Sequence, residues 1–125
     1  MVQLAHGWEL NVERGPDWLF VMPLGSPDEA GEEAGLAETV WSLLERNFSN
    51  RLVLELDHIT YLNSHLVGQL VWLHKRIHSH GGMMRIAGLS DLNQDILHQC
   101  RLDGRFPHFA NRAEAVMSTR TTHPR

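Results

Sequence analysis

The strongest constraint on the fold is the alternation of short apolar runs with longer segments of helical periodicity. Residues 52–56 and 83–87 each have the length and composition of a buried strand, and leucines recur between them at three- and four-residue intervals. Consecutive parallel strands need a long crossover, usually a helix. The middle of the chain therefore predicts two strands joined by a helix.

The same alternation begins nearer the N-terminus. Residues 8–14 alternate apolar and polar side chains, a turn follows at 15–17, and residues 18–22 are continuously apolar, which together predict a hairpin. An acidic run at 28–33 then leads into a helix, where its charge suits the positive end of the dipole. The apolar face of this helix is predicted to consist of Leu36, Val40, Leu43, Leu44 and Phe48.

The second half of the chain continues the pattern. A second helix is expected to begin near Ser64 and to end at Gly81 and Gly82, since glycine favours the position just past a helix. A third, capped by Ser90, is expected to bury one face: Leu92, Ile96, Leu97 and Cys100. A short edge strand at 106–109 and a last helix capped by Asn111 complete the order, and the tail at 118–125 is expected to fray.

Strands that alternate with helices in this way favour an α/β layer fold. We expect a mixed sheet of four to five strands, largely parallel with one antiparallel pair, and about four helices. The 125 residues suffice for one domain with a sizeable core, and we find no repeat or internal linker. A single domain over residues 1–125 is therefore predicted.

Composition narrows the classes of function. The net charge is -4 with histidine neutral, so no basic surface favours nucleic acid or anionic lipid. The single Cys100 allows no disulfide within the chain, which suits a reducing compartment. We find no leader peptide and no apolar stretch near the roughly 20 residues that a transmembrane helix needs. A cytoplasmic protein without membrane insertion is expected.

Motifs across nearly the whole chain resemble those of the STAS domain, the anti-sigma-factor-antagonist family. In that family a buried strand leads to an Asp-Ser-Ser/Thr-Gly-Leu-Gly signature that opens a helix. Here the strand at 52–56 precedes Asn63-Ser64-His65-Leu66-Val67-Gly68. The glycine pair and strand at 81–90, the closing segment at 106–116 and the loop at 25–28 also resemble family motifs. The resemblance implies the STAS fold.

The resemblance further implies a regulatory switch. Bacterial members bind an anti-sigma factor that is also a serine kinase, and phosphorylation in the signature loop abolishes that binding. Ser64 retains the first hydroxyl and is the phosphorylation candidate, whereas Asn63, His65 and Leu66 depart from the signature. The resemblance implies a partner-binding surface, for which we consider six residues: Asp28, Asn63, Ser64, His65, Gly68 and Trp72.

Several of these residues have a simpler interpretation as well. Ser64 could belong to the N-cap of its helix, and Asn63 favours a cap or turn role over a ligand contact. Asp28 could face the partner or simply be a helix N-terminal acid. Trp72 lies off the apolar face of its helix, so we expect it to be exposed beside the signature, where tryptophan is enriched in binding hot spots. The other tryptophans are expected to be core or rim residues.

We find little sign of catalysis or of a bound cofactor. His74 and His78 are four residues apart on one helix, but no third ligand accompanies them, so solvated histidines are favoured over a metal site. No P-loop, nucleophile elbow or catalytic carboxylate pair is present, which favours a non-enzyme. We predict an anti-sigma factor antagonist-like regulator, monomer or weak dimer, that needs no cofactor. The alternative is a constitutive STAS subunit of an ABC-type transport or signalling complex.

Overall fold

The structure is a computed structural model that describes residues 2–3, 9–24 and 35–117. Some of the predictions above concern residues outside this described part of the chain: Trp8, Asp28, the acidic run at 28–33 and the tail at 118–125. The remaining predictions can be compared with the structure directly.

A mixed sheet forms the centre of the molecule, and its six strands lie side by side in sequence order. They are β1 (Val2–Gln3), β2 (Glu9–Arg14), β3 (Leu19–Leu24), β4 (Arg51–Glu55), β5 (Met83–Ala87) and β6 (His108–Phe109). β1, β2 and β3 pair antiparallel, whereas β3, β4, β5 and β6 pair parallel. The predicted fold class is confirmed, and the sheet gains the two-residue β1, which was not predicted.

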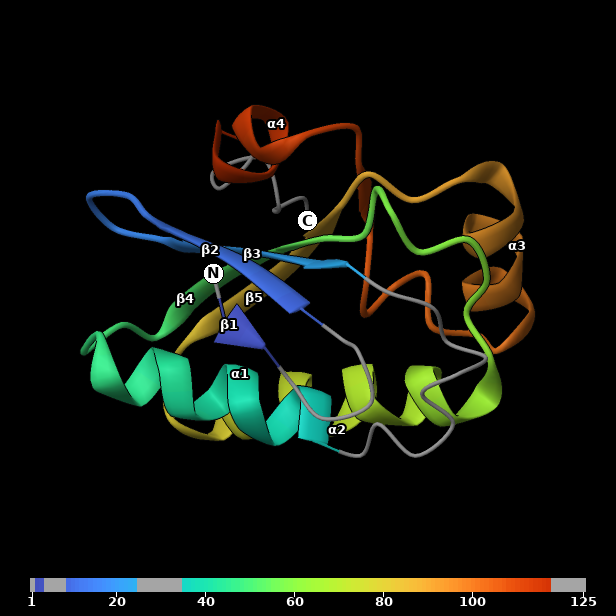
Figure 1. Ribbon diagram of the computed structural model, residues 1–125. Coiled ribbons are helices and arrows are strands. Elements are labelled where there is room, and N and C mark those ends of the chain that lie inside the picture. Colours follow the sequence, from blue (N-terminus) through green and yellow to red (C-terminus); the bar gives the residue numbers. More distant parts are fainter. Residues whose placement is uncertain (1, 4–8, 25–34, 118–125) are drawn as a thin grey trace.

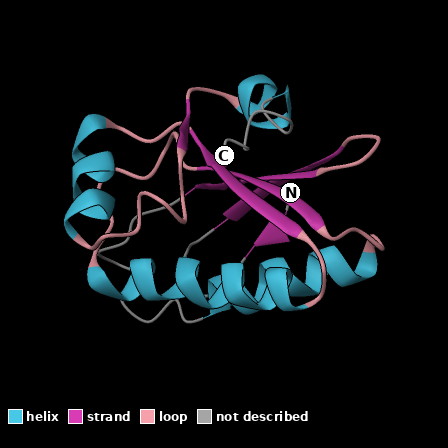
Figure 2. Cartoon of the chain, turned by 180° about the vertical axis from the view of Figure 1, so that it is seen from behind, coloured by secondary structure: helices cyan, strands magenta, loops and turns pink. Residues whose placement is uncertain are grey.

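Four helices surround the described sheet: α1 (Gly35–Arg46), α2 (Ser64–Ser79), α3 (Asp91–Gln99) and α4 (Arg112–Met117). The longer helices α1 and α2 lie side by side along one face, and the short α4 covers the other (Figure 1). α3 stands beside the end of the sheet, as the view from behind also shows (Figure 2). Within the described residues, no helix is both long and apolar enough to cross a bilayer.

The two faces of the sheet bury different amounts of apolar surface. The main core lies beneath α1 and α2 and includes Leu19, Leu54, Leu70 and Ile86, all at most 1% exposed. A smaller cluster on the other face is built from Trp18, Val53, Ala87, Phe109 and Ala115. The side chains along a strand point alternately to opposite faces, so one sheet supplies both clusters.

Two arginines fasten α4 to the sheet. The Arg112 guanidinium donates to the Glu55 carboxylate at 2.7 and 3.0 Å and also pairs with Glu13. The buried Arg85 donates to the Ala115 carbonyl at 2.7 Å. Hydrogen bonding to Glu55 first, and then the hydrogen bond to Glu13 and the charges of both carboxylates, raise the pKa of Arg112. Polar anchors thus supplement a small apolar cluster.

Three core predictions from helical periodicity are wrong. α1 ends at Arg46, two residues before Phe48, which is 96% exposed. α3 buries Asn93 and Leu97, so Leu92 one residue earlier turns outward and is 51% exposed. Cys100 is the exposed C-cap of α3 and not a buried apolar residue. The helix ends before the predicted core residue at Phe48 and at Cys100. At Leu92 the buried face of α3 begins one residue later, at Asn93.

Candidate partner-binding surface

The signature segment opens α2 with a capped N-terminus. Asn63 has extended backbone dihedrals, φ -79° and ψ 172°, and its Oδ1 accepts a hydrogen bond from the Leu66 amide at 2.8 Å. Its carbonyl also accepts from the Val67 amide at 2.9 Å. The predicted cap role of Asn63 is confirmed, and the cap is therefore not Ser64, which is the first helical residue.

Ser64 lies exposed in the first turn of α2. No hydrogen bond joins its hydroxyl to another residue of the described part of the chain. The first turn of α2 contains no acidic side chain, so the positive end of the helix dipole is not already compensated there by a carboxylate. A phosphate on this hydroxyl would meet favourable backbone electrostatics within its own helix.

The signature residues form an exposed stripe along α2. Ser64, Gly68 and Trp72 follow at intervals of four residues, and His65 is exposed beside them. At 1.5 Å per residue the stripe is about 12 Å long. A Cβ added at Gly68 would contact nothing within 4 Å, so neither packing nor a left-handed backbone requires glycine there. Glycine does permit another molecule to approach the backbone of α2 closely.

Trp72 ends the stripe in contact with a cation. Its ring is 37% exposed, which agrees with the predicted exposure, and the Arg76 guanidinium lies 5.2 Å from the ring centroid. Arg76 also lies 5.4 Å from the ring of Trp41 on α1. The two indoles and the guanidinium thus continue the surface from α2 onto α1.

A fully buried asparagine holds the loop that precedes the signature. Asn93, on α3, accepts a hydrogen bond from the Leu62 amide at 2.9 Å and donates to the Ile59 carbonyl at 2.9 Å. Both ends of its amide are satisfied, and the loop between β4 and α2 is fixed by a residue some thirty positions later. Sequence reasoning missed Asn93, although an asparagine inside an otherwise amphipathic helix is an available signal.

A close backbone approach holds the same loop from its other side. Gly88 follows β5 with φ +77°, and a Cβ there would lie 2.2 Å from the Asp57 Oδ1. Glycine is therefore required both by the left-handed backbone and by the space that Asp57 occupies. The loops after β4 and β5 thus meet at the carboxyl end of the parallel strands.

The first turn of α1 is tied to the same helix. The Ala37 amide donates to the Gln69 Oε1 at 2.9 Å, so a side chain of α2 satisfies an unpaired N–H at the start of α1. Gln69 is a second residue that sequence reasoning missed. Asp28, the remaining predicted site residue, lies in the segment before α1 and outside the described residues.

The paired histidines of α2 differ from the prediction. His78 is exposed, but His74 is only 9% exposed, stacks on His78 with ring centroids 4.6 Å apart, and contacts Phe106 edge-on. Burial first, and then His78 and Arg105, lower the pKa of His74 to about 4. The expectation that both are solvated is wrong for His74. Among the described residues, no cluster of three or more metal-binding side chains occurs.

Fold and surface together define a small α/β module with a capped, exposed helix N-terminus at the carboxyl edge of its sheet. The family model of the STAS domain matches residues 10–115. The chain therefore belongs to the STAS domain family. Comparison with curated protein sequences finds no match.

Several solved structures with the same fold are named anti-sigma factor antagonists. One from Mycobacterium paratuberculosis has a TM-score of 0.75 at 18% identity and covers 95% of this chain and 99% of its own. SpoIIAA in its unphosphorylated form has a TM-score of 0.71 at 12% identity, covering 93% and 100%. Phosphorylated Bacillus SpoIIAA has a TM-score of 0.64 at 10% identity, covering 90% and 100%. At these identities the likeness establishes the fold.

Proposed function

We propose that this STAS domain is a cytoplasmic regulatory protein that binds an anti-sigma factor or kinase through the exposed stripe of α2 and is switched by phosphorylation of Ser64. In this proposal it acts by binding rather than by catalysis, without a cofactor, as a single domain that is a monomer or weak dimer. Asn63, His65, Gly68 and Trp72 contribute to the surface, together with the segment that contains Asp28.

One observation carries the proposal. The Ser64 hydroxyl is exposed in the first turn of α2, while the neighbouring Asn63 supplies the cap. Phosphorylation would therefore leave the cap intact and add about 1.5 to 2 negative charges at the start of the exposed stripe of α2. The added charge would weaken binding to an acidic partner and would have to be desolvated in any interface. The names of two structural neighbours record an unphosphorylated and a phosphorylated form of SpoIIAA, which supports this reading.

The first test is phosphorylation itself. The purified protein is incubated with ATP and a candidate anti-sigma kinase, and intact mass is measured. We expect the gain of one phosphate, its loss in Ser64→Ala, and its retention in Ser79→Ala at the other end of the same helix. No gain of mass, together with tight binding that ATP does not change, would refute the switch and leave a constitutive binder.

The second test concerns the surface. Gly68→Ala adds a methyl group that meets nothing within 4 Å inside the protein, so the fold should tolerate it. If the partner approaches the backbone of α2, we expect about tenfold weaker binding in calorimetry. Gly104→Ala is the matched control, because its added Cβ also meets nothing within 4 Å. Equal affinities for the two variants would place the partner elsewhere.

A further inference from the structure

Three helices of this chain end with the same backbone arrangement. At the end of α2, the Gly82 amide donates to the Ile77 carbonyl at 2.8 Å and the Gly81 amide to the His78 carbonyl at 3.0 Å. This pair of hydrogen bonds is the Schellman motif, and Gly81 has the left-handed φ of +76° that the motif requires.

Phe48 occupies the same position after α1. The Ser49 amide donates to the Leu44 carbonyl at 2.9 Å, and the Phe48 amide donates to the Glu45 carbonyl at 3.1 Å. Phe48 therefore adopts φ +51°, a conformation that is strained for a residue with a Cβ. Its side chain is also 96% exposed, so the ring gives the core no packing in return.

The third helix shows how a residue with a side chain can suit the left-handed position just after a helix. Arg101 follows α3 with φ +60°, and the Arg101 and Leu102 amides complete the same motif. Its cation lies at the negative end of the α3 dipole and remains exposed to water. Phe48 has neither compensation: its ring is uncharged and costs free energy in contact with water.

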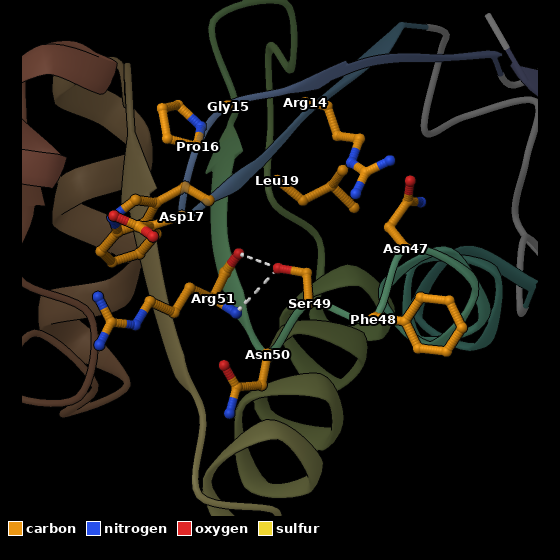
Figure 3. A pocket seen from close by; sticks show the side chains of 11 residues that line it. Arg14, Gly15, Pro16, Asp17, Leu19, Asn47, Phe48, Ser49, Asn50 and Arg51 are labelled. Atoms are coloured by element: carbon orange, nitrogen blue, oxygen red, sulfur yellow. Dashed lines mark hydrogen bonds between the residues drawn. The ribbon is translucent and has the colours of Figure 1, made fainter.

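Phe48 lies at the edge of a cleft of about 320 Å³ at the amino end of the parallel strands. Figure 3 shows the Phe48 ring directed away from the cleft centre, with Arg14 on one side and Arg51 on the other. Neither guanidinium forms an ion pair within the described ranges of the chain, while Asp17 is the sole carboxylate of the lining. The exposed Phe48 ring thus lies on the same side of the cleft as Arg14, whereas the Arg51 guanidinium lies on the far side, 5.8 Å from the centroid of the Trp18 ring.

We propose that Phe48 is the anchor of a second protein-binding surface, at the opposite end of the sheet from Ser64. The partner is a different protein with an apolar pocket bordered by a carboxylate: Phe48 fills the pocket, and Arg14 pairs with the carboxylate. Aromatic and arginine side chains dominate binding hot spots, and strained backbone gathers at functional sites. This surface is independent of the proposed function, since it shares no residue with the stripe of α2.

Charge and burial disfavour two other occupants of the Phe48 surface, a second copy of this chain and an anionic membrane. A second cleft of the described residues, beside α3, has the carboxylates Asp95 and Asp103, but its apolar side chains Leu89, Leu97 and Phe106 are at most 7% exposed. It thus offers the Phe48 ring of another copy almost no apolar contact. The net charge of -4 opposes adsorption of the whole molecule to an anionic membrane.

The test uses p-benzoylphenylalanine, a photoreactive aromatic residue, in place of Phe48 in cells that naturally produce the protein. The same residue in place of Arg101 is the control, because both positions are exposed ends of a helix with a similar backbone. We expect irradiation to link one protein to position 48 and not to position 101. That protein, identified by mass spectrometry and purified, is then titrated with the unmodified chain.

The decisive readout is binding and stability measured on the same variant. Phe48→Gly should weaken binding by about tenfold or more while raising the Tm by roughly 4 °C, since glycine relieves the strained backbone. Arg14→Gln should weaken binding about fivefold and reduce its dependence on salt. If Phe48 had a purely structural role, the Phe48→Gly variant would instead have a lower Tm.

Four outcomes of the crosslinking and titration experiments would overturn the proposal. They are no crosslink at position 48, the same crosslink at both positions, a crosslink only to another copy of this chain, or unchanged affinity of the purified partner for Phe48→Gly. Cosedimentation with phosphatidylcholine–phosphatidylglycerol vesicles that depends on Phe48 would also overturn it in favour of a lipid surface.

Discussion

The two ends of the parallel strands differ in how well their residues suit the local backbone, that is, in helix capping and in the use of glycine at left-handed positions. At the carboxyl end, Asn63 caps α2, Asn93 satisfies the preceding loop, and glycine occupies the left-handed position at Gly88. At the amino end, Gly81 also follows the rule, but Phe48 takes the same backbone conformation with an exposed aromatic side chain. Arg101, the other left-handed residue with a Cβ, carries an exposed cation at the negative end of the α3 dipole, whereas Phe48 at the amino end of the strands has no such compensation.

This difference separates two ways in which a surface can serve binding. The Ser64 end has an ordered framework, so a chemical change at one hydroxyl can alter binding without altering the fold. The Phe48 end retains a residue that folding disfavours. Because local rules are most often broken at functional sites, the conflict itself is informative. Replacing Asn93 at one end and Phe48 at the other should therefore change the free energy of unfolding in opposite directions.

The largest effect is expected at the carboxyl end. Asn93→Ala removes the partners of the Leu62 amide and the Ile59 carbonyl and leaves a cavity beneath the loop. We expect the free energy of unfolding to fall by about 3 kcal/mol in urea titrations. Gln94→Ala, one residue later and only half-buried, should change it by less than about 1 kcal/mol. Similar losses for both would show that Asn93 does not hold the loop.

A pH effect is expected from the middle of α2, between the two ends. The folded-state pKa of His74 is lowered to about 4, so the unfolded chain binds its proton first as pH falls. The stability that this histidine contributes should therefore be present above about pH 6.5 and be lost as pH falls towards 4, by about 2–3 kcal/mol. His74→Gln should flatten this dependence in thermal unfolding, whereas the exposed His58→Gln should not. An unchanged profile for His74→Gln would contradict the assignment.

At the amino end a substitution should stabilise the protein. Phe48→Gly is expected to raise the free energy of unfolding by about 1 kcal/mol, because glycine adopts the left-handed conformation without steric cost. Gly81→Ala, at the equivalent position of α2, should lower it by a similar amount. Chemical denaturation measures both. A loss of stability in Phe48→Gly would remove the contrast between the two ends.

The smallest effect is expected on the stripe itself. Gly68→Ala should raise the free energy of unfolding by about 0.5–1 kcal/mol, since alanine is the better helix former at an exposed position. Thermal unfolding compared with Gly104→Ala, a control outside the helices, measures this gain. Lower stability in Gly68→Ala would mean that the glycine has a structural role.

Local signals predicted most of the elements. Met83–Ala87 and the caps Asn63, Ser90 and Asn111 could be predicted because hydrophobic period and capping chemistry act over a few residues. The same signals failed at Phe48, where the apolar pattern continues past the end of α1. Periodicity shows which face a helix would bury, but it does not show where the helix stops.

The candidate site was predicted only in part, for the same reason. The intervals between Ser64, Gly68 and Trp72 follow from helix geometry, so their common face was predictable. Asn93, Gln69 and the burial of His74 depend on contacts between segments far apart in the sequence. No local pattern encodes those contacts.

By itself, the sequence determined the class of fold and the capped start of α2, because each follows from short-range chemistry. Only the tertiary structure decided that Asn93 holds the signature loop, that His74 is buried, and that Phe48 extends into solvent in a strained conformation. The physical reason is that burial and strain depend on which segments pack together, and packing is a property of the whole fold.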